Sequence, residues 1–163
     1  MTGTLGRGLG RTLEWILITL MVSLTTLVVV AVIFRKSGAS LSFYDEVASV
    51  MLSWITYYGA ALAALRRKHI GFDAVLLSIP MPVRMWFVAL GEVLVIAFFV
   101  LMAWAGFRVL EVLQGETLVS LTWVPVQLTQ SVIPIGAILF IVAELLSLPA
   151  YWRQIAAGES SDH

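Results

Sequence analysis

The sequence predicts an all-α integral membrane protein, a single membrane domain over residues 1–163 with four transmembrane helices. Composition is the first indication, because 60% of the 163 residues are hydrophobic and 12% are charged. Soluble domains are nearer half apolar and a quarter charged. The mean hydropathy of +0.97 agrees. The second indication is that the apolar residues fall into four long runs, separated by links that contain charged residues, Gly or Pro.

The first predicted span covers about residues 15–34, which include no charged residue. About 20 residues of helix extend roughly 30 Å, the thickness of the hydrocarbon core. An unpaired backbone in lipid costs more than the weak helix propensity of this run's Thr and Val residues, so a helix is favoured. The run is longer than the apolar core of a signal peptide, which has about 7–15 residues, and we expect a retained helix.

The second predicted span covers about residues 47–65. Its second half is rich in small residues, Gly59-Ala60-Ala61-Leu62-Ala63-Ala64. Gly59 and Ala63 lie four residues apart and share a helix face, as do Ala60 and Ala64. Small residues at this spacing let two helices approach closely in lipid. The partner helix could belong to this chain or to another subunit.

The link after the second span carries three consecutive cations, Arg66, Arg67 and Lys68, and Arg84 precedes the third span. Apolar residues in this link recur at helical spacing, which predicts a short interfacial helix over about residues 70–79, ending at Pro80. A loop with coincidental periodicity is the alternative. The cations could bind anionic lipid head groups, set the topology, or do both.

The third and fourth predicted spans cover about residues 85–110 and 124–148. Pro134 lies within the fourth and should kink or locally unwind it, because proline removes one backbone hydrogen bond and clashes with the preceding turn. The polar tail, residues 154–163, is expected to be disordered.

The distribution of cations predicts that both termini and the link after the second span lie in the cytoplasm. With four spans, seven of the ten cations fall on one side of the membrane and three on the other, and the positive-inside rule assigns the richer side to the cytoplasm. The seven are Arg7, Arg11, Arg66, Arg67, Lys68, Arg84 and Arg153. The three are Arg35, Lys36 and Arg108.

Glu92 and Glu144 are the candidate functional groups within the spans, because ionisable residues there are costly and often functional. An ion-coupled exporter would use such groups. The alternative is that each is hydrated near the interface, or paired with Arg84 or Arg153. The sequence contains no cysteine and only two histidines, His69 and His163. We therefore expect no cofactor, no metal site and no enzymatic activity.

His69 has two interpretations. It could titrate as a switch with Asp73, one helical turn further on, or it could anchor the short interfacial helix. The balance of ten basic and ten acidic residues leaves no basic surplus for nucleic acid, so no nucleic-acid partner is expected.

One set of residues forms a recognisable motif: Glu46, Trp54, Gly59-Ala60-Ala61-Leu62, Arg67, His69-Ile70, Asp73 and Pro80. This motif resembles that of the small membrane subunit of tripartite ATP-independent periplasmic (TRAP) transporters, the DctQ-like family. Phe34-Arg35 and Ile133-Pro134-Ile135-Gly136 also resemble family positions. Ser49 departs from the family pattern, which often has Arg there, and Ile79-Pro80 replaces Leu-Pro.

The resemblance implies a subunit that supports a large membrane subunit as a stable heterodimer in the bacterial or archaeal inner membrane. The large subunit would carry out sodium-coupled uptake of an organic acid, delivered by a periplasmic binding protein that docks transiently. The expected interface or motif residues are Glu46, Trp54, Gly59, Ala60, Ala61, Arg66, Arg67, His69, Asp73 and Pro134. Two alternatives are a self-contained four-helix carrier that uses Glu92 or Glu144, and an assembly factor with no part in transport.

Overall fold

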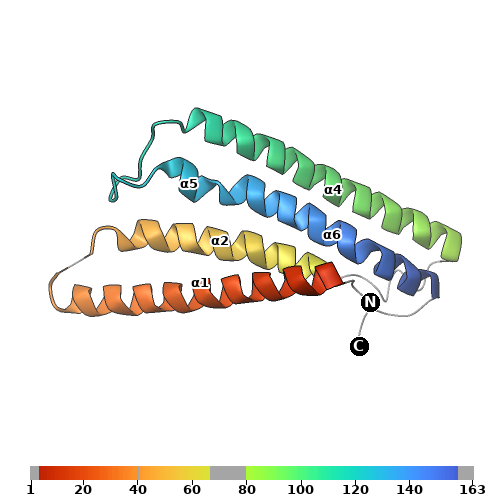
Figure 1. Ribbon diagram of the computed structural model, residues 1–163, viewed down its shortest axis with the longest axis horizontal. Helices are drawn as coiled ribbons and strands as arrows, with labels where there is room; N and C mark the ends of the chain where they lie inside the picture. The colour runs from red at the N-terminus through yellow and green to blue at the C-terminus, as the bar shows by residue number, and fades with distance from the viewer. Residues whose placement is uncertain (1–3, 40, 67–79, 158–163) are drawn as a thin grey trace.

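The computed structural model describes residues 4–39, 41–66 and 80–157, and this part of the chain is helical apart from its connections (Figure 1). The helices are α1 (Thr4–Lys36), α2 (Tyr44–Leu65), α4 (Met81–Val112), α5 (Val126–Gln130) and α6 (Val132–Ala157). Within these residues four helical stretches are long and apolar enough to cross a membrane, namely α1, α2, α4 and the combination of α5 with α6. This confirms the predicted fold class. The interfacial helix expected over residues 70–79 lies outside the described residues.

The helices lie roughly side by side, with α6 between α2 and α4 and with α1 packed on α2 (Figure 1). The start of α1, the end of α2, the start of α4 and the end of α6 gather at one end of the bundle, here called the Arg66 end. The connection from α1 to α2 and helix α5 lie at the other end, here called the α5 end. The outer helices α1 and α4 expose most of their apolar side chains, as expected of surfaces that face lipid or another protein.

Several helices extend beyond the predicted spans. Helix α1 begins at Thr4, well before residue 15, and ends in Arg35 and Lys36, followed by Gly38 at a φ of 83°. Helix α6 continues to Ala157, so the prediction of disorder from residue 154 is wrong for the first four residues of that range. A helix that leaves the hydrocarbon core keeps its own backbone hydrogen bonds, and hydropathy therefore underestimates its length.

The fourth span is interrupted, as Pro134 predicts. Helix α5 ends at Gln130 and α6 begins at Val132, with Ser131 between them. Pro134 has no backbone N–H to donate to the carbonyl four residues earlier, that of Gln130. The helical hydrogen bonding resumes one residue later, where the Ile135 N–H donates to the Ser131 carbonyl at 3.2 Å.

The core lies towards the Arg66 end, where α1, α2 and α6 meet. Its small members, Ala61 and Ala64 of α2 and Ala143 of α6, are fully buried at 0% exposure. Phe140 of α6 stacks on Phe99 of α4, with ring centroids 3.6 Å apart and planes 9° from parallel. The small-residue half of the second span therefore makes close contacts within this chain, one of the two options that the sequence left open.

Candidate functional site

Glu46, in the first turn of α2, holds the loop that joins α4 to α5. Its two carboxylate oxygens accept backbone N–H bonds from Val119 and Ser120, each at 2.9 Å. The Ser120 hydroxyl donates to the same carboxylate. An acidic side chain that accepts three bonds from two successive residues acts as a clamp, because a carboxylate is an acceptor with several lone pairs and no donor. Glu46 thus ties the start of α2 to the opposite half of the chain.

The clamped loop is also closed by its own backbone. The Leu118 N–H donates to the Val124 carbonyl and the Val126 N–H donates to the Glu116 carbonyl, both at 3.0 Å. Within this loop Leu118 is buried at 8% exposure, whereas Val119 and Trp123 are 91% and 79% exposed. The α5 end therefore presents an ordered loop with a large apolar tip, a feature typical of contact surfaces.

Trp54, which lies about two turns after Glu46 in α2, also contacts this region. Its indole N–H donates to the Thr129 carbonyl of α5 at 3.1 Å, and Thr129 itself is buried. The ring also packs edge-on against Tyr58, with centroids 6.0 Å apart. Two motif residues of α2, Glu46 and Trp54, therefore hold the loop and the short helix that precede α6.

Glycines set the distances at which α6 meets its neighbours. A Cβ placed on Gly136 would lie 2.6 Å from the Cβ of Tyr57 in α2. A Cβ placed on Gly106 of α4 would lie 2.8 Å from Cδ of Pro134. Both separations are below any ordinary carbon–carbon contact, so only glycine lets these helices approach as closely as they do. Pro134 is itself fully buried, so it both interrupts the fourth span and fills the α4–α6 contact.

The small residues of α2 lie at its contact with α1. Ala61 is buried in the core with Leu13 of α1, and Ala60 packs at its edge. Gly59 faces α1, since a Cβ there would lie 4.0 Å from Cδ2 of Leu17.

The polar residues of the spans are more deeply buried than the sequence indicated. Glu144 and Ser147 of α6 are 4% and 2% exposed, and Arg84 of α4 is 7% exposed. Glu144 therefore lies inside the bundle and not on its surface. Arg84, for which the sequence leaves lipid binding and topology open, is likewise buried within the chain.

The register of α4 and α6 also relates Glu92 to this group. Phe99 of α4 stacks on Phe140 of α6, and the two helices run antiparallel. Glu92 lies seven residues before Phe99, and Ser147 lies seven residues after Phe140. Glu92 and Ser147 are therefore at similar heights, with Glu144 about one turn away. The Ser147 hydroxyl donates to the Glu144 carbonyl at 2.9 Å. The sequence identified both glutamates but did not indicate that Ser147 and Arg84 would be buried, whereas Glu92 is only partly buried.

Four predicted site residues, Arg67, Lys68, His69 and Asp73, lie outside the described residues. Arg66 is described and is half exposed, forming an ion pair with Glu14 of α1. Among residues 4–39, 41–66 and 80–157, no group of three or more His, Asp or Glu side chains could hold a metal ion.

Residues 24–154 match the family model of the DctQ component of tripartite ATP-independent periplasmic transporters. The chain belongs to the DctQ family. No curated protein matches it. The matched range starts within α1 and ends within α6, so it includes the Glu46 clamp, Trp54 and both glycine contacts. This DctQ protein is accordingly a multi-pass membrane component of a TRAP transporter.

Proposed function

We propose that this DctQ protein is the small permease subunit that supports the large membrane subunit during sodium-coupled uptake of an organic acid. A periplasmic binding protein would deliver the acid, docking transiently, while the two membrane subunits form a stable heterodimer. The observation that carries the proposal is the family match over residues 24–154, which spans most of the chain.

The close packing of the helices is consistent with a rigid subunit that supports the large membrane subunit. The glycine contacts of α6 with α2 and α4 leave little freedom for these helices to slide, because close-packed interfaces have few alternative arrangements. The outer helix α4 presents a long apolar surface, with Val93, Leu101 and Trp104 each more than 60% exposed. A rigid body with such a surface could widen the fixed part of a larger transporter while that transporter's moving part carries the substrate.

The Glu46 clamp supports a docking role for the α5 end. This end holds the ordered loop with the exposed residues Val119 and Trp123. The predicted topology places that loop outside the cytoplasm, on the side where a periplasmic binding protein would arrive.

Reconstituted vesicles test the proposal. The large subunit and the binding protein would be reconstituted with and without this chain, under an inward sodium gradient. We expect uptake to fall and the large subunit to melt at a lower temperature when the chain is omitted. Unchanged uptake and unchanged melting would contradict the proposal. Full uptake by a large subunit from which the chain is stripped after assembly would favour the assembly factor instead.

A self-contained carrier is the second candidate, and the burial of Glu144 at 4% exposure in a span is the observation that favours it. Such a carrier would transport solute as a purified single chain. Glu92→Gln and Glu144→Gln together should abolish that transport. The supporting role predicts no transport by the chain alone, and an effect of these variants on stability only.

A further inference from the structure

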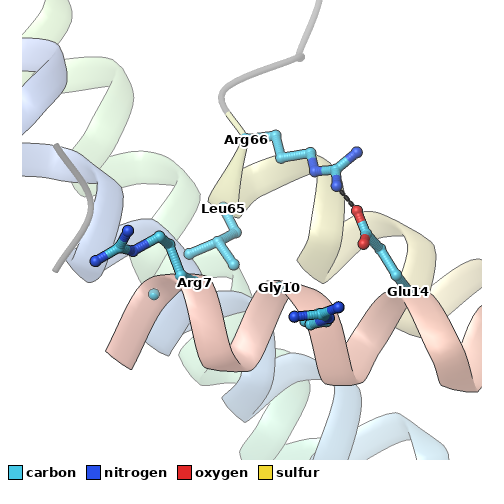
Figure 2. Close-up of a pocket in the computed structure, with 7 residues that line it drawn as sticks. Arg7, Gly10, Glu14, Leu65 and Arg66 are labelled. Atoms are coloured by element: carbon cyan, nitrogen blue, oxygen red, sulfur yellow. Dashed lines mark ion pairs between the residues drawn. The ribbon is translucent and has the colours of Figure 1, made fainter. Parts of the chain in front are cut away.

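A groove lies between the start of α1 and the end of α2, at the Arg66 end of the bundle (Figure 2). Its volume is about 650 Å³, within the range of small-molecule sites. The residues that line it are Gly6, Arg7, Gly10, Arg11, Glu14, Leu65 and Arg66. Neither the transport role proposed above nor the contacts of the core account for it.

Two glycines of α1 form the floor of the groove. Gly6 and Gly10 are both buried and lie one helical turn apart. A Cβ on Gly10 would come within 3.3 Å of Cδ2 of Leu65, so glycine here lets α2 approach α1 while leaving the space beside it open. Figure 2 shows Leu65 lying near Arg7 and Gly10.

The walls of the groove carry an excess of positive charge. Arg7 and Arg11 of α1 are exposed, one turn apart, and Arg66 completes the set from α2. Glu14 is the single carboxylate of the lining and pairs with Arg66 (Figure 2). One carboxylate neutralises one of three guanidinium groups, so two positive charges remain. Arginine donors in a fork arrangement match the oxygens of a phosphate group.

The apolar surface next to the groove distinguishes a lipid from a free anion. Trp15 and Ile18, which follow Arg11 along α1, are 64% and 52% exposed. This exposed apolar face continues along α1 to Phe34. An exposed Trp beside a cationic cluster is typical of the membrane interface. If the arginines held the phosphate of a phospholipid, its acyl chains could lie along this exposed apolar face of α1.

We propose that this groove binds the phosphate head group of an anionic phospholipid, with Arg7, Arg11 and Arg66 as its ligands and with the acyl chains along α1. Glu14 holds Arg66 in place and limits the affinity, because its charge opposes the phosphate. This proposal does not depend on the proposed transport function, because the experiment that tests it measures only lipid binding to the chain.

Native mass spectrometry of the full chain, titrated with phosphatidylglycerol, cardiolipin or phosphatidylcholine, measures the binding. We expect the two anionic lipids to bind more tightly than phosphatidylcholine. Arg7→Gln with Arg11→Gln should weaken anionic lipid binding about 30-fold, taking roughly the free energy of one surface cation for each arginine. Arg35→Gln with Lys36→Gln, at the other end of the same helix, is the matched control and should change it little.

Glu14→Gln provides a test that misfolding cannot mimic. Removing the carboxylate releases Arg66 and raises the net positive charge, so anionic lipid should bind about fivefold more tightly. Equal binding of phosphatidylcholine and the anionic lipids would overturn the proposal. So would competition by inorganic phosphate at the same concentration as lipid, or equal losses in the Arg7/Arg11 and Arg35/Lys36 variants.

Discussion

Gly136→Ala tests how closely α2 and α6 approach. The added Cβ would lie 2.6 Å from Cβ, 2.9 Å from Cδ1 and 3.0 Å from Cγ of Tyr57, whereas ordinary contact begins at 3.4 Å. The Tyr57 Cβ is attached to the α2 backbone and cannot rotate away. The two helices must therefore move apart by nearly an ångström, which loosens their packing along the whole contact.

The cost follows from two opposing effects. Overpacking of a close-packed contact costs about 1–3 kcal/mol. Replacing glycine by alanine in a helix returns up to about 1 kcal/mol of helix propensity. We expect a net loss of about 1–2 kcal/mol, which for a chain of this length lowers the melting temperature by about 2–8 °C.

Thermal unfolding in detergent, followed by size-exclusion chromatography, measures this shift. Gly91→Ala is the matched control, because nothing lies within 4 Å of its added Cβ and it also lies within a long helix. It should leave the melting temperature unchanged or raise it. If Gly136→Ala behaves like Gly91→Ala, α2 and α6 are not held in close contact at this position, and the chain is not the rigid supporting body proposed above.

Two other contacts and the predicted topology can be tested in the same way. Glu46→Gln replaces one carboxylate oxygen by an amide donor, so hydrogen exchange at the two loop amides that it holds should become faster; unchanged exchange would show that the clamp is not needed to order the loop. Phe140→Ala should destabilise the protein by about 3 kcal/mol in denaturant unfolding because it empties the stacked core, whereas Phe98→Ala, at an exposed position, should cost much less. Because the sequence contains no cysteine, Glu116→Cys should react with an impermeant maleimide in intact cells and Gly8→Cys only after permeabilisation; the reverse pattern would invert the predicted topology.

The sequence predicted features that depend on a short stretch of chain. The four spans follow from runs of apolar residues, and the interruption before α6 follows from a single proline. Residues 59–64 of α2 were correctly expected to make close helix contacts, because small side chains at a four-residue spacing have few other uses in lipid. Their partner in α1, Leu13, could not be predicted in the same way.

Glu46 shows where prediction from sequence stopped. The resemblance selected it as a motif residue, but its function as a clamp requires Val119 and Ser120, which lie 73 and 74 residues away along the chain. No periodicity connects these positions. Likewise, the sequence does not indicate Glu14 as the partner of Arg66, since the two residues belong to different helices and have no common motif.

The sequence by itself therefore determined that this protein spans a membrane four times, where its fourth span breaks, and which family it resembles. Only the tertiary structure decided which helices are neighbours, that Arg84 and Glu144 are buried, and that a groove with three arginines opens between α1 and α2. The physical reason is that a span is apolar on all sides. Hydropathy then indicates that the helix belongs in lipid but does not distinguish the face that meets lipid from the face that meets another helix, and that choice depends on close packing and paired polar groups.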